Sequence, residues 1–218
     1  MNSNPSPNPV QRFQDALAVL PLIAILRGLP SSDSVAIGQA LVGEGWRLIE
    51  VPLNSPEPLR SIETMSGEFP GALVGAGTVL KVDQVRDVHA AGGRLIVSPN
   101  FDRDVVGAAV ALGMVCLPGV ATASEAFAAL AAGAHGLKLF PAEMITPVVV
   151  KALRAVLGAD TVVLPVGGIE PGSMAAYRAA GANGFGLGSA LYRPGMDASV
   201  VATNARAFIH VWQGVTVA

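Results

Sequence analysis

Residues 21–53, PLIAILRGLPSSDSVAIGQALVGEGWRLIEVPL, contain two apolar runs separated by an amphipathic segment. The runs at residues 21–27 and 48–53 are apolar on consecutive positions, which is typical of parallel strands buried on both faces. Between them, a predicted helix begins near Ser32, carries apolar residues at helical spacing and ends near Gly43. The stretch therefore predicts a strand–helix–strand unit with parallel strands.

The same alternation continues along the chain. Further strands are predicted at residues 72–77, 94–98, 114–118, 136–140, 162–166 and 184–188. Because helical patterns separate these runs, we expect parallel strands joined by crossover helices. Eight units predict an α/β fold, a single-domain (β/α)8 TIM barrel over residues 15–218, with an open doubly wound sheet as the alternative. Residues 1–14, which begin with an Asn-, Ser- and Pro-rich segment, are expected to be a flexible extension.

The composition and net charge of the chain argue against nucleic acid and membranes as binding partners. The chain has 218 residues, of which 51% are hydrophobic and 14% charged, with a net charge of −2. These values favour a large buried core and give no basic surface for nucleic acid or an anionic membrane. Residues 105–124 are uncharged but interrupted by Gly and Pro, so they predict a helix, a turn and a strand rather than a membrane span. The N-terminus lacks a secretory signal, and the single Cys116 cannot form an internal disulfide, so a cytoplasmic location is expected.

No metal or cofactor is expected. The three histidines, at positions 89, 135 and 210, fall on or after helical patterns rather than at strand ends, which predicts surface or hydrogen-bonded residues. No cluster of His, Cys and carboxylate residues has the spacing of metal ligands.

Lys138 is the most informative polar residue, because it interrupts the apolar run GLKLFP. Barrel active sites lie at the carboxyl ends of the strands. Burial disfavours the ammonium form and lowers the pKa, and only the neutral amine attacks a carbonyl carbon. The alternative is a lysine that reaches solvent from a strand end or pairs with a carboxylate.

Glu50 interrupts a second apolar run, LIEVPL, four strands away in the predicted barrel. Both side chains are expected at the same barrel mouth, where a Schiff-base aldolase requires a nucleophilic lysine and a proton shuttle. The alternative is a structural ion pair of Glu50 with Lys138 or Arg27.

Glycines end the last two predicted strands, in Val166-Gly167-Gly168 and Gly186-Leu187-Gly188-Ser189. Barrels often bind phosphate at these two loops through backbone N–H groups. The alternative is that both are ordinary turns between a strand and a helix.

Seven motifs together resemble the 2-dehydro-3-deoxy-phosphogluconate/phosphogalactonate aldolase family, in the same order and over nearly the whole chain after the N-terminal extension. They are LIAILRG (22–28), IEVPLNSP (49–56), GAGTVL (75–80), IVSPN (96–100), LKLFP (137–141), VGGI (166–169) and GLGSALY (186–192). The resemblance implies a homotrimeric class I aldolase that releases pyruvate and D-glyceraldehyde 3-phosphate from a phosphorylated sugar acid without a metal.

The resemblance also implies roles for individual residues. Lys138 corresponds to the Schiff-base lysine and Glu50 to the acid/base. Arg27 and Thr78 correspond to ligands of the carboxylate end of pyruvate. The remaining expected substrate-binding residues are Gly168, Gly188 and Ser189 on the phosphate side, together with Val166, Pro99 and Phe140.

The chain departs from the gluconate-type members of this family at three positions. Gluconate-type members usually have an arginine four residues after the glutamate, where this chain has Asn54, so Arg27 is expected to supply the positive charge. They also have a threonine before the double glycine, where this chain has Val166. In their Ser-Pro-Gly motif, the position of the glycine is occupied by Asn100 in this chain. A threonine hydroxyl could hold the C4 hydroxyl in one configuration. The departures at Asn100 and Val166 resemble the galactonate branch of the family, with a gluconate or dual-epimer enzyme as the alternative.

Two more distant functions share the glycine-rich phosphate end. A phosphate-binding barrel isomerase or synthase would favour paired carboxylates, histidines or a metal over one buried lysine. A non-catalytic barrel that binds a sugar phosphate would have no need to bury Lys138.

Overall fold

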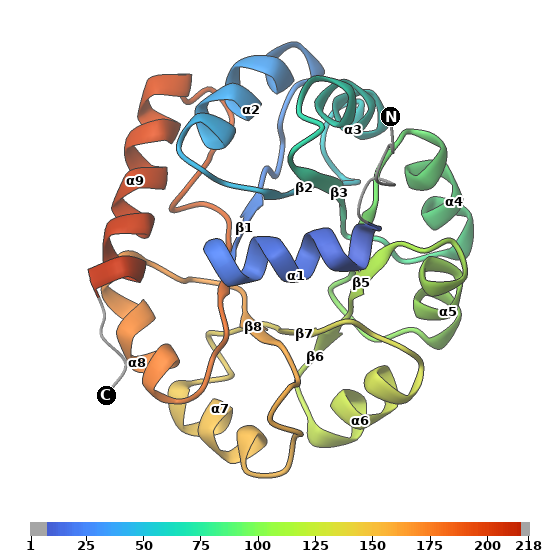
Figure 1. Cartoon of the computed structure of the whole chain (residues 1–218), viewed down its shortest axis with the longest axis vertical. Helices are drawn as coiled ribbons and strands as arrows, with labels where there is room; N and C mark the ends of the chain where they lie inside the picture. Colours follow the sequence, from blue (N-terminus) through green and yellow to red (C-terminus); the bar gives the residue numbers. More distant parts are fainter. Residues whose placement is uncertain (1–7, 215–218) are drawn as a thin grey trace, which may run out of the picture.

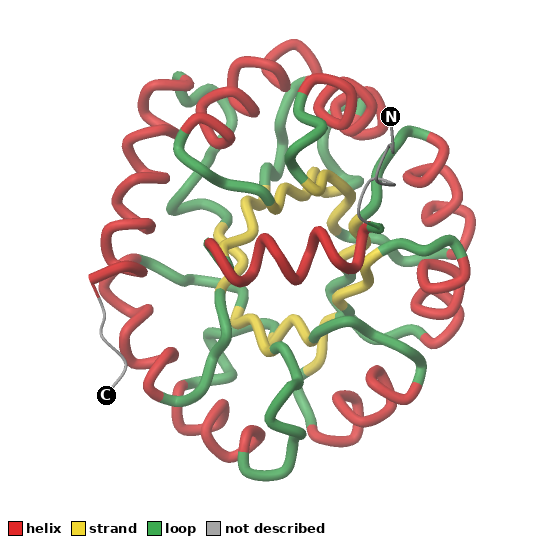
Figure 2. Tube along the Cα trace, in the orientation of Figure 1, coloured by secondary structure: helices red, strands yellow, loops and turns green. Residues whose placement is uncertain are grey.

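The computed structural model describes residues 8–214. Figure 2 shows short strands around a common centre, with most helices outside them. The helices are α1 (Pro9–Val19), α2 (Ser34–Gly43), α3 (Pro58–Glu68), α4 (Val82–Ala90), α5 (Arg103–Ala111), α6 (Ala123–Ala131), α7 (Pro147–Arg154), α8 (Met174–Ala179) and α9 (Ala198–Gly214), with 3-10 turns η1 (Ser31–Asp33) and η2 (Pro171–Ser173). The strands are β1 (Leu22–Ile25), β2 (Leu48–Pro52), β3 (Leu73–Gly77), β4 (Leu95–Val97), β5 (Val115–Leu117), β6 (Gly119–Val120), β7 (Leu137–Leu139), β8 (Val163–Pro165) and β9 (Phe185–Leu187).

The described strands form two sheets, and every strand pair within them is parallel. One sheet has six strands in the order β5-β4-β3-β2-β1-β9, and the other has three in the order β6-β7-β8. A parallel bridge between Val166 and Gly186 links the end of β8 to β9. The prediction of an α/β fold with parallel strands is therefore confirmed, and each predicted run contains a strand.

Alternate residues of each strand point to opposite faces, and this decides where Glu50 lies. On β2, Leu48 belongs to an interior cluster that also contains Ile23 and Leu73. Ile49 and Val51 belong instead to the larger cluster that includes residues of the surrounding helices. Glu50 lies between these two outward residues, on the same inner face as Leu48.

Helix α1 corrects the expected boundary of the N-terminal extension. The Asn8 side chain accepts a hydrogen bond of 2.8 Å from the Gln11 N–H, and Pro9 occupies the first turn. Phe13 and Ala16 are buried in the interior cluster, and α1 crosses the end of the strand ring in Figure 1. The expectation of a flexible segment was thus wrong for residues 9–14, because an amphipathic helix covers the interior here. Residues 1–7 of the predicted extension lie outside the described residues.

Residues 105–124 are divided among α5, β5, β6 and the start of α6, as the helix–turn–strand interpretation predicted. Of the helices described, none is both long and apolar enough to cross a membrane. Cys116 is buried in β5, and burial raises the pKa of its thiol to about 12.

Candidate active site

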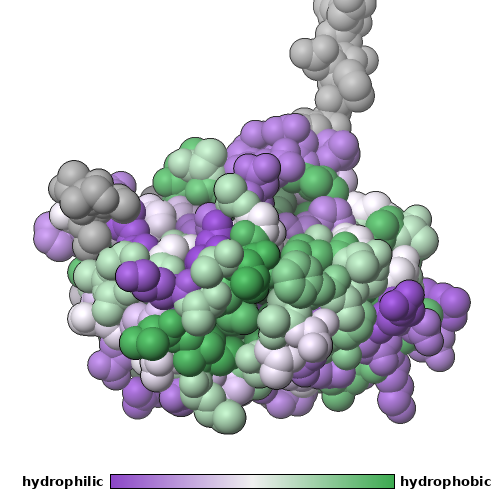
Figure 3. Space-filling view, turned by 90° about the horizontal axis from the view of Figure 1, so that it is seen from below, coloured by the Kyte–Doolittle hydropathy of each residue, from purple (hydrophilic) through white to green (hydrophobic). Residues whose placement is uncertain are grey.

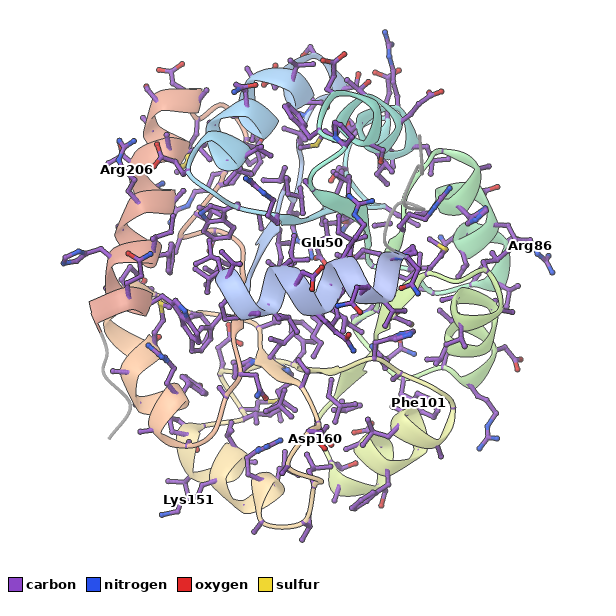
Figure 4. All side chains as sticks on the ribbon, viewed as in Figure 1. Glu50, Arg86, Phe101, Lys151, Asp160 and Arg206 are labelled. Atoms are coloured by element: carbon purple, nitrogen blue, oxygen red, sulfur yellow. The ribbon has the colours of Figure 1, made fainter. Side chains whose placement is uncertain are left out.

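Glu50 lies on the inner face of β2 and is 1% exposed. In Figure 4 it projects near the centre of the strand ring, whereas the labelled Arg86, Lys151 and Arg206 lie at the periphery. Its carboxyl group packs against Gly77, where an added Cβ would lie 2.5 Å from Oε1. Its Oε2 is buried and has no hydrogen-bond partner among residues 8–214. Burial raises the pKa of Glu50, and the nearby charges of Lys138 and Arg27 oppose this rise.

Lys138 occupies the middle of β7 and is 6% exposed. Its neighbours Leu137 and Leu139 point into the outer core, so the lysine side chain points inward. The Nζ atom lies 4.9 Å from the centroid of the Phe140 ring. Burial lowers the pKa of Lys138, the charge of Glu50 raises it, and the charge of Arg27 lowers it further. The predicted burial and lowered pKa of this lysine are confirmed.

The ion pair weighed as an alternative for Glu50 is not formed. Within residues 8–214, no salt bridge joins Glu50 to Lys138 or to Arg27. Arg27 instead donates a hydrogen bond of 2.9 Å from Nη1 to Oδ1 of Asn54. The next residues along each loop are also joined, because the Gly28 N–H donates to the Ser55 hydroxyl at 2.9 Å. The loops after β1 and β2 are therefore held together.

A cavity of about 450 Å³ opens at the carboxyl ends of β1, β7, β8 and β9. The predicted site residues that line it are Arg27, Lys138, Phe140, Val166, Gly168, Gly188 and Ser189. Glu50, Thr78 and Pro99 are not among its lining residues. Thr78 directly follows β3 with a positive φ of 58°, and Pro99 follows β4. Both lie at the same end of the sheet as the cavity but do not line it.

The glycines at the β8 end adopt backbone conformations that other residues rarely take. Gly167 and Gly168 have φ values of 114° and 58°. An added Cβ on either would meet the Glu143 carboxylate, which lies against the turn. The β8 end is joined to the loop after β7, because the Ala142 N–H donates to the Val166 carbonyl at 2.8 Å. Both glycines also line the cavity and present backbone rather than a side chain to it.

The turn after β9 begins at Gly188. The Gly188 carbonyl accepts hydrogen bonds from the N–H groups of Leu191 at 2.8 Å and Tyr192 at 2.9 Å. The N–H groups of Ser189 and Ala190 make no hydrogen bond within the described part of the chain. Two adjacent free N–H groups at the start of such a turn are suited to binding an anion.

The cavity-lining residues that the sequence analysis did not assign to the site include Glu170, Tyr192, Arg193 and Pro194. Three follow Ser189 in the loop before α9, and none interrupts an apolar run, which was the signal used. Arg193 directly follows the motif GLGSALY (186–192), and this nearness to Ser189 was the available signal for that residue. Three cations and one carboxylate thus line the cavity, namely Arg27, Lys138, Arg193 and Glu170.

The sequence prediction also covers the histidines and possible metal ligands of the described residues. The part of the chain described contains no group of three or more His, Cys, Asp or Glu side chains placed to hold a metal ion. The Cys116 N–H donates to Nδ1 of His135 at 3.1 Å, so this histidine is a hydrogen-bonded structural residue, as predicted.

The matching family model, KDPG and KHG aldolase, covers residues 13–207. The chain belongs to the KDPG and KHG aldolase family. It is 49% identical over 196 residues to a probable 2-dehydro-3-deoxy-6-phosphogalactonate aldolase of Rhizobium meliloti, covering 89% of this chain and 92% of that protein. It is 45% identical over 195 residues to the 2-dehydro-3-deoxy-6-phosphogalactonate aldolase of Escherichia coli, covering 89% and 95%.

Solved structures agree with this family. A native KDPGal structure superposes with a TM-score of 0.88 at 45% identity, covering 89% of this chain and 95% of that chain. A cube-shaped cage, designed by fusing symmetric oligomeric domains, matches with a TM-score of 0.87 at 45% identity, covering 89% and 72%.

Proposed function

We propose that this family member is a class I aldolase that cleaves 2-dehydro-3-deoxy-6-phospho-D-galactonate to pyruvate and D-glyceraldehyde 3-phosphate. The observation that carries the proposal is the inward-facing, buried Lys138, whose pKa is lowered by burial and which lines a cavity close to the buried Glu50. The names of the two relatives at 49% and 45% identity support the substrate.

Lys138 is the nucleophile in this proposal. Its lowered pKa keeps a larger fraction of the amine neutral near pH 7 than a solvated lysine would have. The neutral Nζ attacks the C2 ketone of the substrate to form a carbinolamine, and loss of water gives an iminium. This cation accepts the electron pair of the C3–C4 bond when that bond breaks.

Glu50 carries the protons. A carboxyl group whose pKa is raised by burial can exchange protons nearer to neutral pH than an exposed one. It protonates the departing hydroxyl of the carbinolamine and then removes the proton of the C4 hydroxyl as C3–C4 breaks. Glyceraldehyde 3-phosphate leaves, and the remaining enamine is protonated at C3. Hydrolysis of the resulting iminium releases pyruvate and restores the free lysine.

The two anionic ends of the substrate match two ends of the cavity. Arg27 is held by Asn54, and its charge acts on both Glu50 and Lys138, which suits it to the carboxylate next to the ketone. The glycine turns after β8 and β9, with Ser189, suit the terminal phosphate. Thr78, Pro99 and Phe140 complete the proposed set of substrate-binding residues.

Val166 is the proposed reason for the galactonate preference. It lines the cavity at the end of β8, next to Gly167. A valine has no hydroxyl with which to fix the C4 hydroxyl of the gluconate epimer. The second candidate, an enzyme that accepts both epimers, rests on the same residue.

We also propose that the two sheets form one closed (β/α)8 barrel. Only Pro118 separates β5 from β6, and counting these as one bent strand gives eight strands. Two hydrogen bonds support this count: His135 N–H to the Cys116 carbonyl at 3.0 Å, and Lys138 N–H to the Pro118 carbonyl at 3.0 Å. The Val166–Gly186 bridge supports closure between β8 and β9.

A homotrimer is the proposed assembly. Figure 3, which views the molecule from the side of α6 and α7, shows a large apolar area on its surface. Exposed apolar side chains on these elements and the loop before α7 are Phe127, Met144, Val148 and Val149. Exposed apolar surface of this kind marks a subunit contact. A chain that is 45% identical to this protein occurs in a cage designed by fusing symmetric oligomeric domains, and this supports the proposal of an oligomer.

Borohydride trapping tests the proposed function. The protein is incubated with pyruvate and reduced, and its peptides are measured by mass spectrometry. We expect a reduced pyruvate adduct on Lys138 and none on Lys151, an exposed lysine of α7. Lys138→Arg should abolish both the adduct and cleavage while leaving the circular dichroism spectrum unchanged, because arginine stays protonated. Cleavage retained in this variant would exclude a Schiff base at Lys138.

A further inference from the structure

Arg193 lies in the loop between β9 and α9 and lines the cavity beside Gly188 and Ser189. Its Nε donates a hydrogen bond of 2.9 Å to the Ser189 carbonyl. The other N–H groups of the guanidinium make no hydrogen bond or salt bridge to residues that the structure describes. A guanidinium has five N–H donors in a planar fork, so most of its donors remain for a ligand.

The backbone on both sides of Arg193 is anchored. Tyr192 precedes it and is 2% exposed, packed within the large core cluster. Pro194 follows it and lies against Gly28 in the loop after β1, where an added Cβ would lie 2.7 Å from the proline Cγ. The Nε bond to Ser189 then fixes the direction of the side chain. The position of this cation at the cavity rim is therefore set by the fold.

The two arginines of the cavity lie on different loops and act on different groups. Arg27 acts electrostatically on both Glu50 and Lys138, and Asn54 holds it at the β1–β2 side. Arg193 is not among the charges that act on Glu50 or Lys138. It lies on the loop that also presents the free N–H groups of Ser189 and Ala190. Arg193 is thus the cation that belongs to the proposed anion-binding turn.

We propose that Arg193 binds the terminal phosphate of the substrate through its Nη groups and determines specificity for phosphorylated over unphosphorylated sugar acids. This inference rests on the proposed aldolase function, whose substrate carries a phosphate at the end opposite the ketone. A phosphate dianion receives charge-assisted hydrogen bonds from the guanidinium fork and neutral ones from the Ser189 turn. Glu170, the carboxylate at the same cavity, makes no salt bridge to Arg193 within the described chain, so the guanidinium is available.

Two measurements on the full chain test this role. Inorganic phosphate is titrated calorimetrically into the wild type, Arg193→Ala and Arg193→Lys, with Arg86→Ala as the matched control. Arg86 is an exposed arginine of α4 that pairs with Asp83 at 2.8 Å and lies outside the cavity. The second measurement is the ratio of kcat/KM for the phosphorylated acid to kcat/KM for the same acid without phosphate.

For Arg193→Ala, we expect phosphate affinity and the kcat/KM ratio each to fall by about tenfold to a hundredfold, the range for losing charge-assisted hydrogen bonds. Arg193→Lys should lie between this variant and the wild type, and Arg86→Ala should match the wild type. Equal phosphate affinity in wild type and Arg193→Ala would overturn the inference. An equal fall in kcat/KM for both acids, with a lower melting temperature, would also overturn it, because the role would then be structural. Borohydride trapping of pyruvate on the same variants tests the aldolase function separately, since pyruvate carries no phosphate.

Discussion

Arg27 donates a hydrogen bond of 2.9 Å from its Nη1 atom to the Oδ1 atom of Asn54, and this contact connects the loops after β1 and β2. Asn54 is four residues from Glu50 and supplies an acceptor rather than a charge. The contact therefore places the guanidinium of a neighbouring strand near the reacting groups.

Replacing Asn54 by Ala tests this relationship. Without its acceptor, Arg27 can adopt other rotamers and will bind the substrate carboxylate less well. We expect KM to rise about threefold to tenfold, the scale of one hydrogen bond, with a smaller change in kcat. Steady-state kinetics measures both values, and an unchanged KM would show that Asn54 does not position Arg27 for the substrate.

Glu50→Gln removes the proposed proton shuttle while keeping the shape of the side chain. We expect cleavage to slow by about two to four orders of magnitude, as is typical for a lost general acid/base. Pyruvate trapping on Lys138 should weaken too, because dehydration of the carbinolamine also needs a proton. A variant that cleaves at the wild-type rate would leave Glu50 as a buried structural carboxylate.

Val166→Thr should shift specificity at C4 toward the gluconate epimer. The two side chains have nearly the same shape, but threonine can donate a hydrogen bond to the C4 hydroxyl. We expect the ratio of kcat/KM for the two epimers to change about threefold to tenfold. Both epimers are assayed on both proteins. A constant ratio would reduce Val166 to a packing residue, and a wild type strongly selective for the gluconate epimer would contradict the galactonate assignment.

The lowered pKa of His135 predicts that the free energy of unfolding falls at acid pH. Burial lowers its pKa below the ordinary value of 6.5, so the unfolded chain binds a proton at a pH where the folded chain does not. The contribution to stability is complete above about pH 6.5 and is lost as the pH falls through the folded-state pKa. Protonation also removes the acceptor of the Cys116 N–H.

Urea unfolding between pH 4 and 8 measures this effect. His135→Gln should flatten the pH dependence of the free energy of unfolding, whereas the exposed His210→Gln should leave it unchanged. The same acid slope in wild type and His135→Gln would assign it to other groups.

The buried part of the site could be predicted from the sequence because polar residues are conspicuous in apolar strands. Glu50 and Lys138 interrupt runs of consecutive apolar residues, and the structure buries both. The strands themselves could be predicted because each is a run of consecutive apolar residues. Their ends could not be, since a proline such as Pro118 divides an apolar run without a change in hydropathy.

The exposed part of the site gave weaker signals. Arg193 and Glu170 lie in loops, where charged residues are ordinary, and only the folded chain places them at the cavity. The start of helix α1 was missed because the Asn-, Ser- and Pro-rich composition of the N-terminal segment was given more weight than its helix-start signals. Asn8 before Pro9 is an N-cap followed by a first-turn proline, and Phe13 and Ala16 are spaced to bury one helix face.

Helix α1 and the cluster beneath it fill the strand ring at the end opposite the cavity. Substrate and products therefore enter and leave the proposed active site at the same end of the barrel. In the proposed mechanism the keto acid end becomes attached to Lys138, so its three-carbon fragment departs after the aldehyde phosphate. This order predicts that pyruvate competes with substrate for the free enzyme, and that the aldehyde phosphate competes with protonation at C3 for the enamine-bearing form.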